Sequence, residues 1–339
     1  SSATQQGATA LGHLAQATGI RSTALGTGSK ANASCSLAVG WKANATATNA
    51  TAIGYTANAV GINSTAVGTS ALAGNNYASA FGTEASATGL ASMAFGAGSI
   101  ANETGAITLG VNSIASGANS SAFGTEANAS AQDAMAMGYL ANASGIDSIA
   151  IGTSALANKA NTTAIGTEAK ATGENSTTYG DSSTASGSNS AAFGFKATAS
   201  GGDSTSIGKG SRATQQGSTA IGHVASATAV RTTAIGTGSK ASAQCALAVG
   251  WKANATAVNG SSETVTCKPV SLASKRSKPR NNPPPPARTI PRSTISADNS
   301  GGVRSSVTRT ASTIALVGSL RASRISSEVI VSIFGKPIT

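Results

Sequence analysis

The residues best suited to catalysis are few in this sequence, and they recur at matching places instead of gathering. Its two histidines, His13 and His223, stand 210 residues apart, and Glu84, Glu126 and Glu168 follow one another at intervals of 42. General acid–base chemistry and glycoside hydrolysis both need two groups held close together. The spacing instead indicates rows of like residues on a surface, and we expect neither an enzyme nor a bound cofactor.

Cysteines and glycines give no metal or phosphate site either. Cys35 and Cys245 repeat the spacing of the histidines, and no Cys/His pair has the spacing of a zinc site. The two cysteines are too far apart to bridge, so we expect small buried thiols, although symmetry mates in an oligomer could approach each of them. The glycines form no phosphate loop or dinucleotide fingerprint, and the calcium-binding nonapeptide is absent.

The regular feature of the chain is a glycine at every fourteenth residue. Such fixed self-similarity predicts a repeat architecture rather than conventional domains. The eighteen copies are Gly12, Gly26, Gly40, Gly54, Gly68, Gly82, Gly96, Gly110, Gly124, Gly138, Gly152, Gly166, Gly180, Gly194, Gly208, Gly222, Gly236 and Gly250.

Small residues alternate on either side of this glycine, which we take as position 0. Position +5 is always Ala, position +3 is Ala or Ser, and positions −4 and −2 are small in nearly every copy. Alternation predicts two short strands per repeat with the small side chains inward, joined by turns at the glycine and near position +7. We predict an all-β, flattened parallel solenoid of about 18 coils and about 85 Å.

Composition and charge divide the chain at residue 260. Aromatic residues are 4% and charged residues 10% of the 339, too few for a large globular core. The net charge of +11 splits into +2 for residues 1–260 (11 Lys+Arg, 9 Asp+Glu) and +9 for residues 261–339 (12 and 3). We therefore expect no nucleic-acid binding by the repeat region and no transmembrane helix.

Residues 261–339 form a basic segment rich in Pro, Ser and Arg. It includes four consecutive prolines at 283–286 and basic residues at 275–280. This composition predicts a disordered tail. A misread reading frame or an unrelated extension would look the same, and a genuine tail could tether the chain to nucleic acid or another anionic surface.

Two rows of large side chains are candidate interaction sites. Position −1 is apolar; it either faces outward, as a stripe covered by identical stripes of other chains, or turns inward between the strands. The stripe comprises Val39, Ile53, Val67, Phe81, Phe95, Ile151, Ile165 and Ile235. Position +1 carries aromatic residues that either contact a protein or glycan partner or pack on the neighbouring coil. They are Trp41, Tyr55, Tyr139, Phe195 and Trp251.

Asn-x-Ser/Thr sequons are numerous, among them Asn49, Asn63, Asn161 and Asn175. In a secreted eukaryotic protein they would accept glycans. A repeat rich in Asn, Ser and Thr also generates them for structural reasons, and that interpretation is favoured.

The pattern Ser-x-Ala-apolar-Gly-x-x-Ala/Ser-x-Ala-x-Gly, seen at 64–73 and 148–157, resembles the head repeat of trimeric autotransporter adhesins, the YadA-like head. The resemblance covers residues 1 to about 260. It implies a left-handed parallel β-roll, a homotrimer, and attachment to host or matrix proteins or glycans. It also implies a location at the cell surface, in the outer membrane or outside the cell. No heptad stalk or anchor strands are recognised after the repeats.

Two other functions fit a solenoid. Similar head repeats occur on phage fibres and surface appendages, so a structural shaft is one alternative. An ice-binding solenoid is another, but Thr occupies position +1 in only seven of eighteen copies, and we expect no thermal hysteresis. A second level of repetition, residues 3–50 recurring at 213–260, favours an extendable rod over a site assembled once.

Overall fold

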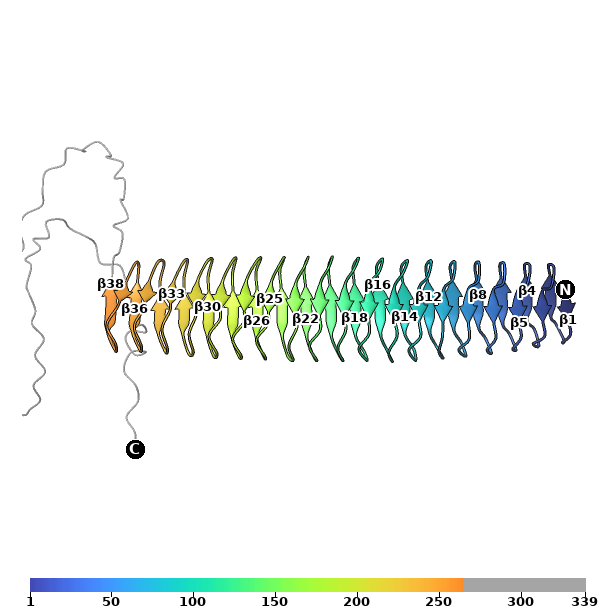
Figure 1. The fold of residues 1–339 in the computed structure, drawn as a ribbon, viewed down its shortest axis with the longest axis horizontal. Coiled ribbons are helices and arrows are strands. Elements are labelled where there is room, and N and C mark those ends of the chain that lie inside the picture. Colours follow the sequence, from blue (N-terminus) through green and yellow to red (C-terminus); the bar gives the residue numbers. More distant parts are fainter. Residues whose placement is uncertain (265–339) are drawn as a thin grey trace, which may run out of the picture. The chain divides into compact units, whose positions relative to one another are not determined.

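The computed structural model describes residues 1–264, and this part of the chain is a stack of parallel β-coils. Two sheets run the length of the stack, with nineteen strands in each, and no helix is present among the described residues. Each strand pairs with the strand fourteen residues before and after it: Thr65 lies beside Thr51 and Ser79. The predicted parallel β-solenoid is confirmed (Figure 1). Its left-handed winding stays a prediction.

The two sheets differ in the length of their strands. The wide sheet contains the even-numbered strands, which cover positions −3 to −1 and are β2 (Thr9–Leu11), β4 (Thr23–Leu25), β6 (Leu37–Val39), β8 (Thr51–Ile53), β10 (Thr65–Val67), β12 (Ser79–Phe81), β14 (Met93–Phe95), β16 (Ile107–Leu109), β18 (Ser121–Phe123), β20 (Met135–Met137), β22 (Ile149–Ile151), β24 (Thr163–Ile165), β26 (Thr177–Tyr179), β28 (Ala191–Phe193), β30 (Thr205–Ile207), β32 (Thr219–Ile221), β34 (Thr233–Ile235), β36 (Leu247–Gly250) and β38 (Ser261–Thr264).

The narrow sheet contains the odd-numbered strands, which cover positions +4 and +5 and are β1 (Ser2–Ala3), β3 (Gln16–Ala17), β5 (Lys30–Ala31), β7 (Asn44–Ala45), β9 (Asn58–Ala59), β11 (Leu72–Ala73), β13 (Ser86–Ala87), β15 (Ile100–Ala101), β17 (Ile114–Ala115), β19 (Asn128–Ala129), β21 (Asn142–Ala143), β23 (Leu156–Ala157), β25 (Lys170–Ala171), β27 (Thr184–Ala185), β29 (Thr198–Ala199), β31 (Arg212–Ala213), β33 (Ser226–Ala227), β35 (Lys240–Ala241) and β37 (Asn254–Ala255).

The last strand, β38, continues the wide sheet beyond residue 260, where the glycine pattern ends. It pairs with β36 over four residues although its sequence is Ser-Ser-Glu-Thr. The predictions for the basic tail concern residues that, from 265 on, lie outside the described part of the chain.

Two tight turns connect the strands of each coil. In one, the N–H of Ala43 donates to the carbonyl of Gly40 at 3.4 Å; in the other, the N–H of Ala50 donates to Ala47 at 3.1 Å. The third residue of each turn, Lys42 or Asn49, has a positive φ of 51° or 57°. Asn adopts this conformation readily, whereas Lys does so less often. Its N–H donates to Thr27 of the previous coil at 2.9 Å, so stacking overrides the local preference.

The interior is as thin as the sequence predicts. Side chains at positions −4, −2, +3 and +5 are buried, and nearly all of them are Ala, Ser or Thr. Inward serines bond to the first carbonyl of their own turn: Ser22 Oγ donates to Gly19 at 2.7 Å and Ser29 Oγ to Gly26 at 2.9 Å. Where position −2 is Thr178 or Ser206, its hydroxyl pairs with the serine at +3 of the same coil.

A larger side chain in this interior should be poorly tolerated. Ala136 of β20 is fully buried between Ala122 and Ala150 of the adjacent coils. We expect Ala136→Leu to lower the free energy of unfolding by about 1–3 kcal/mol or more, because overpacking forces the two sheets apart. Chemical denaturation measures the loss. Ala136→Ser combined with Ala141→Ser is the control, since Ser206 and Ser211 already form this hydroxyl pair in another coil, and an equal loss in both variants would contradict the overpacking argument.

Candidate interaction surfaces

The outer face of the wide sheet carries a continuous row of large apolar or aromatic side chains at position −1, from Leu11 to Val249. None of the described side chains at position −1 is buried in the single chain, so this row points outward and not between the strands. Ile53, Phe81 and Ile235 are exposed, and Val39, Val67, Phe95, Ile151 and Ile165 are half-buried. Phe81 and Phe95 stack on each other with ring centroids 4.9 Å apart. The eight residues of the predicted stripe therefore share one face.

A second row widens this face, and sequence reasoning missed it. Position −3 lies on the same side of the wide sheet as position −1, because both flank the buried residue at −2. Half of its eighteen copies are Thr, but it includes the exposed Leu247 and five half-buried residues, Leu37, Met93, Ile107, Met135 and Ile149. The small residue at position −2 was the available signal: because it faces inward, the residues on both sides of it, at −3 and −1, must face outward together. We call the two rows together the apolar face.

The aromatic residues at position +1 lie along the first turn, at one edge of the stack. All five predicted residues are exposed, Trp41 by 38% and Tyr55 by 52%. Trp41 and Tyr55, in adjacent coils, stack with centroids 4.5 Å apart and planes 11° apart. Tyr139, Phe195 and Trp251 lie too far along the chain to join them. In the stacked pair, each ring covers one face of the other.

Lysine side chains cover several of these rings, a feature that sequence reasoning did not identify. Lys42 Nζ lies 4.2 Å from the centroid of Trp41, and Lys252 Nζ lies 4.4 Å from that of Trp251. Phe195 has two such neighbours, Lys196 at 5.0 Å and Lys209 at 5.7 Å. These are cation–π distances. The aromatic–Lys dipeptides at 41–42, 195–196 and 251–252 were the available signal.

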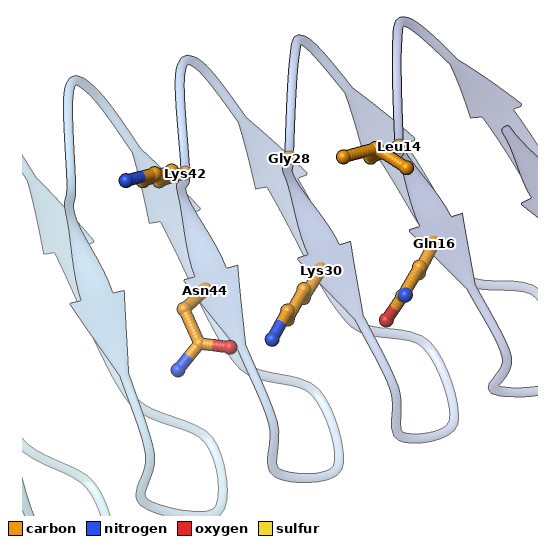
Figure 2. A pocket seen from close by; sticks show the side chains of 6 residues that line it. All are labelled: Leu14, Gln16, Gly28, Lys30, Lys42 and Asn44. Atoms are coloured by element: carbon orange, nitrogen blue, oxygen red, sulfur yellow. The ribbon is translucent and has the colours of Figure 1, made fainter.

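A shallow hollow of about 520 Å³ opens beside this edge, on the outside of the narrow sheet. Leu14 and Lys42 stand on either side of Gly28, which has no side chain to fill the row at position +2 (Figure 2). Below them Gln16, Lys30 and Asn44 project from three successive strands, β3, β5 and β7. We call these six residues the N-terminal hollow. It offers two ammonium groups and two amides and contains no carboxylate, hydroxyl or thiol.

The opposite edge carries a ladder of amide side chains. The Asn161 amide donates to Asn175 at 3.1 Å, Asn175 to Asn189 at 3.2 Å, and Asn189 to Asp203 at 3.1 Å. Asn49 likewise donates to Asn63. The sequon residues Asn49, Asn161 and Asn175 thus have a structural role, since the nitrogen that a glycan would modify links neighbouring coils.

Cys35 belongs to the same edge, and the prediction that it is buried was wrong. It is exposed, and Cys245 is half-buried. Both have a φ of 57° in the second turn, one residue before an inward position, so their side chains leave the roll on its outer side.

The residues considered for catalysis stay apart. His13 and His223 lie in the first-turn row fifteen coils from each other, about 70 Å at the normal strand spacing. Glu84, Glu126 and Glu168 are exposed at position +2, three coils apart. Within residues 1–264, no three His, Cys, Asp or Glu side chains are grouped so that they could hold a metal ion. No helix in that part of the chain is long and apolar enough to cross a membrane.

Comparison with known proteins gives a family match over most of the solenoid. The family described as the YadA head domain repeat (2 copies) matches residues 3–29, 31–57, 59–85, 87–113, 101–127, 129–155, 157–183, 179–197, 185–211, 199–225, 213–239 and 227–253. Comparison with curated proteins finds no match. Among solved structures, the collagen-binding domain of the Yersinia adhesin YadA is 26% identical over 46% of this chain and 67% of that chain, with a TM-score of 0.27.

Proposed function

Since this chain belongs to the YadA head-repeat family, we propose that it is the non-enzymatic head of a surface adhesin, assembled as a parallel homotrimer. Family membership supports an adhesin-type role and a location at the cell surface or outside the cell. The ligands would be host or matrix proteins or glycans, bound through the long exterior of the rod. The observation that carries the proposal is the apolar face, which runs without a break from Leu11 to Val249.

The apolar face supports association with copies of the same chain. Large continuous apolar surfaces are rare on soluble monomers and mark interaction sites. This surface repeats every fourteen residues over about 85 Å, so the partner needs the same period and length. A second and a third copy of the chain, parallel and in register, satisfy that requirement, since each −1 row then meets equivalent rows at the same height. Three copies with their wide sheets inward also leave the narrow sheets facing outward.

The proposal makes two measurable statements about the full chain. Sedimentation equilibrium should give a homotrimer, and the trimer should attach to surfaces coated with a matrix protein such as collagen. The same assays on a variant that cannot trimerise, described in the Discussion, provide the control. A monomer at all concentrations would refute the assembly.

Attachment separates the adhesin from a structural shaft. A stable trimer that binds none of the matrix proteins and no glycan would identify the chain as the shaft of a phage or surface fibre. The broken row of Thr at position +1 gives ice binding no comparable support, and a thermal hysteresis measurement on the trimer is expected to show none.

A further inference from the structure

Charge is unevenly distributed along the rod. Because each coil advances the stack by one strand spacing, the position of a residue in the sequence gives its height. Residues 43–158 contain no Lys or Arg and five carboxylates. Residues 204–260 contain five Lys and Arg and no carboxylate. The C-terminal end of the described solenoid is therefore basic, and its middle is acidic.

Four of the five cations of residues 204–260, together with Lys196, lie on one side of the coils. Lys209 is at position +1, Lys196 and Lys252 at +2, and Arg212 and Lys240 at +4. All five are exposed along the first turn and the adjoining outside of the narrow sheet. We call them the basic flank. From Lys196 to Lys252 they span four coil steps, about 19 Å. Arg231 does not belong to the flank, because it lies in the second turn, at the opposite edge.

Three of these cations make cation–π contacts with aromatic rings. Lys196 and Lys209 come from different coils, yet both ammonium groups lie within 6 Å of the Phe195 ring, and Lys252 lies over Trp251. Restricting a flexible ammonium before binding reduces the entropy that binding must remove. The ring faces that contact lysine are at the same time less available for stacking with a ligand.

The N-terminal hollow is a smaller copy of this arrangement. Duplication of residues 3–50 at 213–260 makes Lys30 and Lys42 the equivalents of Lys240 and Lys252. Gly28 and Gly238 correspond as well. A Cβ added at either glycine would meet only the Cγ of the lysine at the same position of the next coil, Lys42 or Lys252, at 3.4 Å. The lysine pair beside a side-chain-free glycine thus occurs twice, fifteen coils apart.

From these observations we infer that the basic flank binds a linear polysaccharide bearing sulfate or carboxylate groups, and that the N-terminal hollow is a second, weaker site for it. This deepens the proposed adhesin function by naming a ligand class. A small anion would meet one or two cations, whereas an extended chain lying along the rod meets all five. Single-stranded nucleic acid is less well matched, because it depends on aromatic faces open to its bases.

The first test is lysine footprinting on the full chain, with heparin as the sulfated probe and mass spectrometry of acetylated lysines as the readout. Heparin should protect Lys196, Lys209, Lys240 and Lys252 first, and Lys30 and Lys42 at higher concentration. Lys170 is the internal control: it lies on the same side at position +4, but between Glu168 and Glu174 in the sequence, and it should stay reactive. Equal protection of Lys170 and Lys159 would overturn the inference.

Matched variants separate the site from net charge. Lys196→Ser, Lys209→Thr and Arg212→Thr together place at each position a residue type that other coils already carry there. We expect the heparin concentration that half-protects Lys240 and Lys252 to rise about tenfold or more, with a shallower dependence on salt concentration. The control triple, Arg21→Asn, Lys159→Ala and Arg231→Asn, removes three cations from the opposite edge and should stay within about twofold of the parent. Equal losses in both triples, or no loss in the first, would refute the site.

Other partners give distinct results. If oligo(dT) protects the basic flank as well as heparin does, the flank binds polyanions in general and not polysaccharides in particular, and the inference is overturned. Protection that appears without heparin as the protein concentration rises would mean that basic ends of rods contact acidic middles of others, which also overturns the inference. If heparin does not protect the basic flank while the trimer still binds matrix proteins, this inference is refuted and the proposed adhesin function stands. Flank protection in a chain that remains monomeric refutes the trimer instead.

Discussion

Gly96→Ala is expected to destabilise the solenoid by about 2–6 kcal/mol, among the largest effects of any single substitution in the described chain. Gly96 is the position-0 glycine in the middle of the stack, and its φ is +135°, which L side chains rarely adopt. An added Cβ would overlap the carbonyl oxygen of Gly110, the corresponding glycine of the next coil. Neither atom can move away without opening the hydrogen bonds between two coils, because the oxygen belongs to the backbone and the position of the Cβ is fixed by the backbone to which it is bonded.

Gly98→Ala, in the same turn, is the matched control. Gly98 has a φ of +64°, and the nearest obstacle to a Cβ is the amide oxygen of Asn112, at the end of a side chain that can rotate. Lys42 and Thr56 already occupy this position in other coils with similar φ values. We expect a loss of about 1 kcal/mol. Thermal and urea unfolding of both variants measures the difference; similar losses would show that the glycines at position 0 are not required by coil stacking.

Phe95→Lys combined with Leu109→Lys is expected to convert the trimer into a monomer. The two residues lie at position −1 of adjacent coils and are paired in the wide sheet. In the proposed trimer each chain would place two ammonium groups in an apolar interface beside those of its partners. Burial of an unpaired charge costs several kcal/mol, and here six charges of one sign would be confined together. Sedimentation equilibrium reports the change directly.

The control for this variant is Ile100→Lys with Ile114→Lys. These residues lie in the same two coils, on the outside of the narrow sheet, where Lys30, Lys170 and Lys240 already occupy the corresponding position. The control should remain trimeric and keep its unfolding midpoint. Two trimeric variants would mean that the apolar face is not the interface, and two monomeric variants would mean that added charge alone dissociates the assembly.

The period of small residues was enough to predict the fold. Alternate Ala and Ser around Gly68 determine which side chains face inward, and a one-residue shift would place Val67 in an interior too thin to hold it. The left-handed turn positions were less predictable, because Lys42 and Thr56 adopt a conformation that their own preferences oppose. Contacts between coils impose it, and such contacts exist only once the stack has formed.

The candidate surfaces followed from sequence only in part. The row at −1 was identified because its residues are large and regular. Its neighbours at −3 were overlooked, since Thr65 and Met93 occupy equivalent positions and share no evident chemistry. The association of Lys209 with Phe195 joins residues fourteen apart through the stack, and a search for local motifs does not consider such pairs. The exposed Cys35 was misassigned because its size, and not its position in the turn, was taken as the guide to burial.

The direction of the hydrogen bonds between coils has a mechanical consequence. Strands lie across the long dimension of the solenoid, and their backbone hydrogen bonds run along it, each coil joined only to the coil before and the coil after (Figure 1). Tension applied along the length therefore passes through every junction in series, and the weakest junction sets the breaking force. Three parallel chains would divide that tension. An adhesin that holds a cell against flow would then gain strength from its number of chains, and gain reach from its number of coils.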